Sequence, residues 1–200
     1  STMVTEHAAQ QIILRDKEMP NAEDDKHAND EKILIPMKYP EYAQRLVNVA
    51  MMMRNPKNTT GLVGLNVVYD DDDMHRNMEQ GQQLLDRMAS YAAAADMTMQ
   101  TQVRVAANIA NGIRHAFKEY RATDVLIGMH MHPEVSQKFW GAFHQSLFNG
   151  LNSQIVMARL NQPLSTIRRV QVAVPSRAQF EPGFYRWLER VCRLAANMEC

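Results

Sequence analysis

Two glycines in the second half of the chain have the spacing of a phosphate-binding loop. Gly128 ends the apolar run of residues 125–127, and Gly141 opens a stretch with helical spacing. A glycine after a buried strand lets the backbone approach a ligand closely, because it carries no Cβ atom. The first N–H groups of a helix have no partner within the helix, and they favour a phosphate. This pattern of strand, loop, glycine and helix therefore indicates a nucleotide-type site.

The same loop carries His130 and His132, and His144 follows it. A metal site is one interpretation, but in an extended loop the first two histidines point to opposite sides, whereas zinc needs three or four converging ligands. We therefore predict no metal site. A more specific alternative is that these histidines sense pH, because histidine titrates near neutral pH. The simplest interpretation is that these histidines are polar loop residues.

Strands and helices alternate around this loop, and each has a clear apolar pattern. The chain predicts strands at 33–37, 60–69, 97–105, 123–128 and 154–159, with helices at 41–54, 75–95, 108–120 and after Gly141. Such alternation is typical of an open parallel five-stranded sheet with helices on both faces, and the alternating strand 97–105 belongs near its edge. Ligands of such sheets bind beyond the carboxyl ends of the strands. The expected pocket is bounded by Met37, Lys38, Val67, Val68, Gly128, Met129, His130, Met131, Gly141, Ala142 and Phe143.

Composition limits the function classes. The 200 residues contain 22 basic and 22 acidic side chains, and this balance argues against a nucleic-acid partner, which favours a basic stripe. No run approaches the ~20 apolar residues that span a bilayer, so we expect a soluble fragment without direct membrane insertion. Cys192 and Cys200 are expected to be free thiols. No nucleophile–base arrangement and no paired carboxylates stand out, so we expect no enzyme.

The chain divides into three parts. Residues 1–31 combine a short helix with a charged linker, and residues 32–160 form the α/β domain. Residues 161–200 begin a second unit, because 167–175 is again an apolar strand ending in proline and 180–197 is again helical. This is the pattern of an internal repeat that is cut short. The aromatic face around Trp187 must then be covered by the main domain or by a second chain.

The Gly128 loop resembles the signature of the universal stress protein family. That signature reads glycine, two residues, glycine, nine residues, glycine and then serine or threonine, and it cradles the phosphates in the members that bind ATP. Here Gly128 and Gly141 match, while Met131 stands at the second glycine and Ala142 at the hydroxyl residue. The methionine side chain occupies space that a phosphate needs, and alanine offers no hydroxyl group.

The first strand also resembles that family, whose fold is of the adenine nucleotide alpha hydrolase type. The family strand runs into an aspartate that contacts the nucleotide, and Lys38 stands at that position here. The run 62–69 resembles the second strand, whose end lies against the adenine. The resemblance implies a degenerate nucleotide pocket without a cofactor, or with weak adenine nucleotide binding at most. Lys38 is expected to pair with the acidic run 70–73, or with an acidic ligand.

A second resemblance concerns the segment Ile33–Pro40 and the helix after it, which look like the cytoplasmic tail of bacterial monovalent cation:proton (Na⁺/H⁺) antiporters. It implies a non-catalytic regulatory or interaction domain at the cytoplasmic face of the inner membrane. The partner would be the transmembrane antiporter domain of the same full-length chain. Two alternatives stay open, an ATP- or AMP-binding universal stress protein and an interaction module with a filled pocket.

The fifth strand is the expected contact between two copies. In the universal stress family this strand commonly pairs with its copy across a two-fold axis, and an exposed strand edge favours such pairing. The resemblance therefore implies a homodimer, although the partial second repeat could instead cover this edge. The residues of this strand are Gln154, Ile155, Val156, Met157, Ala158 and Arg159.

Overall fold

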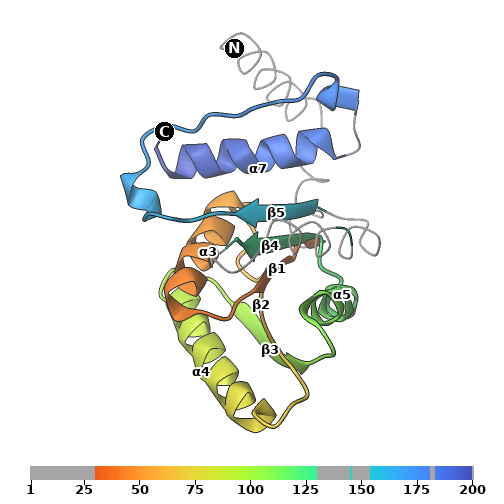
Figure 1. The fold of residues 1–200 in the computed structure, drawn as a ribbon. Helices are drawn as coiled ribbons and strands as arrows, with labels where there is room; N and C mark the ends of the chain where they lie inside the picture. Colours follow the sequence, from red (N-terminus) through yellow and green to blue (C-terminus); the bar gives the residue numbers. More distant parts are fainter. Residues whose placement is uncertain (1–29, 130–144, 146–153, 181–182, 200) are drawn as a thin grey trace.

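Five parallel strands form one sheet in the order β3-β2-β1-β4-β5 (Figure 1). The computed structural model describes residues 30–129, 145, 154–180 and 183–199. The strands are β1 Ile33–Pro36, β2 Leu62–Val68, β3 Met99–Val105, β4 Asp124–Gly128 and β5 Gln154–Ala158. The predicted α/β fold with an open parallel five-stranded sheet is confirmed, and β3 lies at the edge as expected.

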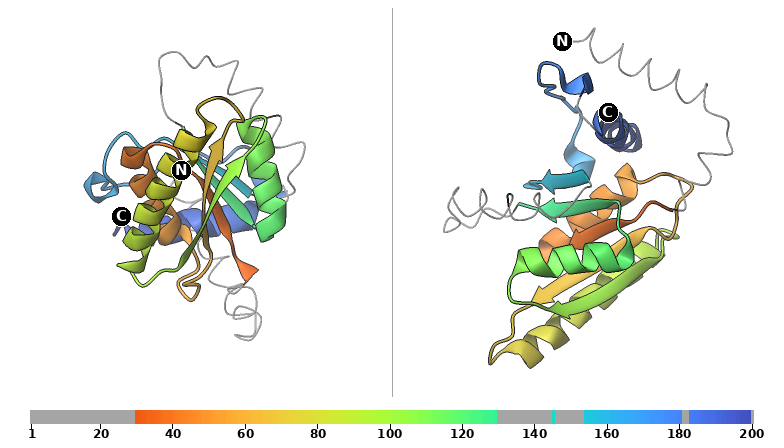
Figure 2. Two further views of the ribbon diagram at one scale, coloured as in Figure 1. Left: turned by 90° about the horizontal axis from the view of Figure 1, so that it is seen from below. Right: turned by 90° about the vertical axis from the view of Figure 1, so that its right-hand side faces the viewer.

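Helices cover both faces of this sheet (Figures 1 and 2). The helices are α3 Pro40–Met53, α4 Met74–Ala93, α5 Ile109–Tyr120 and α7 Phe184–Asn197, with short 3₁₀ turns η1 Leu164–Thr166 and η2 Ala178–Phe180. Helices α3 and α4 share one apolar core with the sheet, and α5 forms a second core on the opposite face. Figures 1 and 2 show α7 beyond β5, and α7 packs against α3.

Local sequence explains where these helices begin and end. Pro40 occupies the start of α3, where its missing N–H group costs nothing. Asn108 begins α5, and its side chain accepts a hydrogen bond from the Asn111 N–H at 2.9 Å. Arg121 ends α5 in the left-handed conformation, with φ of 52°. The residues predicted to face inward on α3 are all buried: Leu46, Val49, Ala50 and Met53.

The C-terminal part differs from the expectation. Residues 167–175 do not form the predicted strand, because no described strand lies beside them to share backbone hydrogen bonds. The predicted helix begins at Phe184 rather than at Phe180, which lies in η2. Gly183 has φ of 80°, a conformation that a right-handed helix cannot continue through. The expected helix at 2–14 and the linker before Asp30 lie outside the described residues.

The described helices do not include a candidate membrane span. None of them combines the length and the apolar character needed to cross a bilayer.

Candidate functional site

A cavity of about 360 Å³ lies at the carboxyl ends of β1 and β2, against α4. The ends of these strands contribute its inner wall, and polar side chains of α4 contribute the facing wall. Its lining consists of Lys38, Tyr39, Pro40, Asn66, Val67, Val68, Tyr69, Asn77, Gln80, Gly81, Gln83, Leu84 and Arg87. The described part of this lining contains no carboxylate, histidine, serine, threonine or cysteine, and its hydroxyl groups are those of Tyr39 and Tyr69.

The charge of this cavity is positive. Lys38 and Arg87 are its charged side chains, and neither forms an ion pair within the described part of the chain. The Lys38 ammonium lies 5.9 Å from the centre of the Tyr39 ring. The expected pair between Lys38 and the acidic run 70–73 is therefore wrong for the described structure. Asp73 pairs instead with Arg76, at 2.9 Å and one turn along α4.

Helix α4 lies close to β2 on the inner side of the cavity, where Gly81 faces Asn66. The Asn66 side chain donates a hydrogen bond to the Met37 carbonyl at 2.9 Å, which ties the end of β1 to β2. A Cβ atom at Gly81 would lie 2.3 Å from the Asn66 side-chain oxygen. Glycine at this position of α4 therefore allows the helix to approach the buried amide, at a cost in helix propensity.

The structure brings together only part of the pocket that the sequence predicts. Lys38, Val67 and Val68 line the cavity, and Met37 is buried beside it. Gly128 and Met129 do not line it, and the Met129 N–H donates to the Ala158 carbonyl at 2.8 Å, so this donor serves the sheet. The other predicted pocket residues lie outside the described part of the chain: His130, Met131, Gly141, Ala142 and Phe143.

The predicted dimer strand is an edge strand in the structure. β5 pairs with β4 in parallel and has no other described strand as a neighbour. Its residues from Gln154 to Ala158 are half-buried, and Arg159 beyond its end is exposed. The edge position agrees with the expectation for Gln154 to Arg159, and pairing with a second copy stays a prediction.

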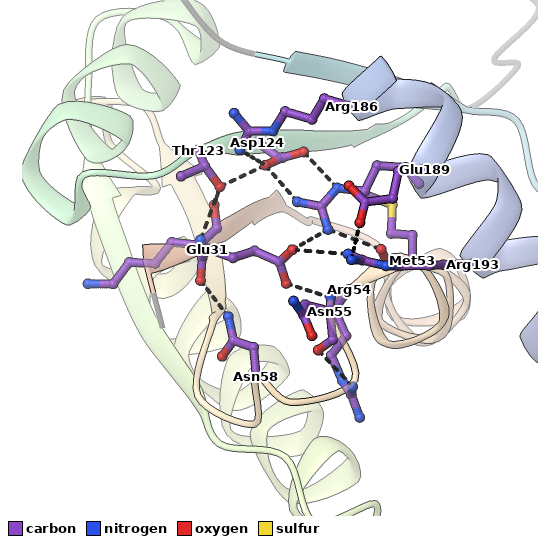
Figure 3. A network of polar contacts seen from close by, with 12 residues as sticks. Glu31, Met53, Arg54, Asn55, Asn58, Thr123, Asp124, Arg186, Glu189 and Arg193 are labelled. Atoms are coloured by element: carbon purple, nitrogen blue, oxygen red, sulfur yellow. Dashed lines mark hydrogen bonds and ion pairs between the residues drawn. The ribbon is translucent and has the colours of Figure 1, made fainter. Parts of the chain in front are cut away.

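A second polar site lies at the opposite, amino-terminal edge of the sheet. Arg190 of α7 is only 5% exposed and donates to both oxygens of Asp124, at 3.1 and 3.2 Å. It also forms an ion pair with Glu31 and donates to the Met53 carbonyl at 3.1 Å. Figure 3 shows the side chains of Glu31, Asp124 and Arg193 converging between the sheet and α7.

Hydrogen bonds within the domain hold Glu31 and Asp124 in place. Asp124 is the first residue of β4, is fully buried, and accepts a hydrogen bond from the Thr123 hydroxyl at 2.7 Å. The Asn58 amide donates to the Glu31 carbonyl at 2.7 Å. A Cβ atom at Gly61 would lie 2.4 Å from that carbonyl oxygen, so glycine is required there. The Glu31 carboxylate in turn accepts the Asn55 N–H at 2.9 Å.

The electrostatics of this network keep Arg190 charged. Burial alone would lower the pKa of Arg190, but the charges of Asp124 and Glu31, with their hydrogen bonds, raise it above the ordinary value. Stability that depends on this raised pKa is fully present below the ordinary value and is lost only as pH rises above the raised one. Arg190 therefore does not titrate near neutral pH. Nearby, burial lowers the pKa of Arg54 although Glu31 opposes this shift.

Burial also raises the pKa of the Cys192 thiol, with a smaller contribution from Glu189, so this free thiol stays protonated at neutral pH. The described residues contain no cluster of three or more side chains that could hold a metal ion.

Sequence reasoning missed the network at the amino-terminal edge. Two signals were present: Asp124 opens an otherwise apolar strand, and Arg186, Arg190 and Arg193 recur at four- and three-residue spacing, which places them on one face of a helix. A charged residue at the start of a buried strand needs a partner, and an arginine face on a later helix can supply one. The pairing itself joins residues 66 positions apart, and no local pattern predicts it.

Comparison with known proteins establishes the fold. No protein-family model matches the chain, and no curated protein is significantly similar to it. The universal stress protein from Archaeoglobus fulgidus has 12% identity and a TM-score of 0.53, and UspA from Lactobacillus plantarum has 12% identity and a TM-score of 0.52. A universal stress protein in complex with cAMP has 11% identity and a TM-score of 0.53. Each similarity covers 64% of this chain and 97% of the other, so the described domain has the universal stress protein fold.

Proposed function

We propose that this chain is a non-catalytic regulatory domain with the universal stress protein fold, attached to the transmembrane part of a bacterial cation/proton antiporter. The resemblance of Ile33–Pro40 to antiporter tails supports the attachment. In this assignment the domain lies at the cytoplasmic face of the inner membrane. It acts by binding and assembly, as a homodimer that pairs through β5.

One observation carries the non-catalytic part of this proposal. Among the described residues, the cavity at the carboxyl ends of β1 and β2 is lined by two cations and several amides, and by no carboxylate, histidine or thiol. Lys38 stands where the family's nucleotide-contacting aspartate is expected, so a contact that needs a carboxylate cannot form. A lining of two cations and several amides suits the binding of a ligand, and this supports a role in binding rather than turnover.

Deletion of residues 32–200 from the full-length protein tests this proposal. We expect the truncated transporter, reconstituted in proteoliposomes, to retain ion exchange but to lose its dependence on cytoplasmic conditions, because the regulatory domain is gone. A variant with an exposed change in the same domain, Asp86→Ala, serves as the control for assembly. Unchanged transport together with unchanged regulation after the deletion would contradict the proposal.

A second candidate function is adenine nucleotide binding. Lys38 and Arg87 line the cavity without carboxylate partners in the described structure, and two such cations suit a phosphate group. One structural neighbour was solved in complex with cAMP. In this alternative the chain is an ATP- or AMP-binding universal stress protein rather than the regulatory domain of an antiporter.

A further inference from the structure

The contact between α7 and the domain is mainly polar. The most buried apolar side chains of α7, Phe184 and Leu188, pack with Ala178 and Trp187 of the same C-terminal segment, and they do not join either core of the sheet. Within α7, Leu194 reaches the core of α3 and α4, as does Met198 directly after the helix, and both are partly exposed. Interfaces with so little shared apolar surface permit relative motion.

Arg190 is the most deeply buried polar side chain of α7 at this interface. Its guanidinium contacts the carboxylates of Glu31 and Asp124 and the carbonyl of Met53, and together these three groups occupy its donors on more than one side. The three groups that surround the guanidinium all belong to the domain and form a recess. Asp124 lies at the start of β4, Glu31 lies before β1, and Met53 lies at the end of α3. Hydrogen bonds to Asn55, Asn58 and Thr123 fix the recess.

We propose that Glu31, Asp124 and the Met53 carbonyl form a guanidinium socket, and that α7 is a releasable strap which Arg190 fastens into it. Two buried carboxylates in one recess favour a cation strongly, and the planar fork of arginine can bond both at once. Because the rest of the α7 interface is sparse and polar, removing this arginine frees the helix while the sheet stays folded. This inference is independent of the proposed function.

The socket also links the two ends of the described chain. Glu31 lies two residues before the start of β1, and Arg190 lies 159 residues later. When α7 is docked, Arg190 therefore fixes Glu31 at the start of the domain. When α7 is released, Glu31 loses this contact. A partner that presents an arginine on a helix would compete for the same socket.

Hydrogen exchange on the full chain, read by mass spectrometry, tests the socket with Arg190→Ala. We expect exchange in residues 184–197 to rise about a hundredfold, while β1, β2 and β4 change little. Arg186→Ala is the matched control, because Arg186 contacts the same Asp124 at 3.0 Å but its side chain is 44% exposed. That control should raise exchange less than about tenfold.

Chemical rescue gives the second readout. Guanidinium chloride at tens of millimolar should restore part of the α7 protection in Arg190→Ala, and sodium chloride at the same concentration should not. If Arg190→Ala does not fold, Arg190→Lys replaces it, because lysine keeps the charge and loses the planar fork. The proposal is overturned if α7 and the sheet lose protection together, if α7 is unaffected, or if both salts act alike.

Discussion

Asp124→Ala lowers the free energy that holds α7 to the domain by about 3 to 5 kcal/mol, because it leaves the buried guanidinium of Arg190 with one carboxylate instead of two. Asp124 is fully buried and also accepts a hydrogen bond from the Arg186 guanidinium at 3.0 Å. Removal of one partner of a buried pair costs far more than removal of a surface pair, since the remaining charge stays out of water.

Urea titration followed by Trp187 fluorescence measures this effect. Trp187 lies on α7, and a Trp140→Phe background leaves it as the single tryptophan of the chain. The matched control is Asp86→Ala, which removes an exposed carboxylate that accepts only from Gln82 on the surface of α4. A shift no larger than that of the control would show that Asp124 does not hold α7.

Leu85→Ala lowers the free energy of unfolding by about 3 to 5 kcal/mol, at the upper part of the range for buried leucines. Leu85 is fully buried between α4 and the sheet. It covers Gly64 of β2, where a Cβ atom would lie 3.1 Å from the Leu85 methyl group. Gly64 has no side chain that could move into the gap, and Met99 is the neighbouring side chain that could fill part of it.

Thermal or urea unfolding followed by circular dichroism measures the loss. Leu85→Met keeps most of the side-chain volume and serves as the control, with an expected cost below about 1.5 kcal/mol. Equal effects of alanine and methionine would contradict the packing described for α4 over Gly64.

The elements that carry periodic apolar patterns could be predicted from the sequence. The α3 face of Leu46, Ala50 and Met53 follows helical spacing, and all three residues are buried. β2 is apolar except at Asn66, because it lies in the interior of a parallel sheet with both faces covered. Local signals suffice here, since each pattern reports one face of one element.

Contacts that depend on several distant elements could not be predicted in this way. Arg87 and Gln83 of α4 line the cavity because α4 lies close to β2 at Gly81, and the sequence motif of the pocket contains no residue of that helix. Likewise, the strand expected at 167–175 has the apolar pattern of a strand but no neighbour in the described sheet. A strand needs a partner for its backbone groups, and no pattern within the segment reports whether that partner exists.

The cavity lies at the carboxyl ends of the strands and the socket at their amino ends, and the charged side chains of the two sites have opposite sign. Lys38 and Arg87 give the carboxyl edge a positive cavity without a described counter-charge. Asp124 and Glu31 give the amino edge two buried carboxylates that Arg190 neutralises. The two ends of the parallel strands therefore carry sites of opposite charge, one open and one filled by Arg190.

Isothermal titration calorimetry of the full chain with ATP measures whether the cavity can hold a triphosphate. We expect no binding of ATP tighter than millimolar, and the same result with ADP and AMP, because Lys38 replaces the expected aspartate and Ala142 offers no hydroxyl group. Saturable micromolar binding of ATP at one site per chain, weakened by Lys38→Ala or by Gly128→Val, would contradict this expectation.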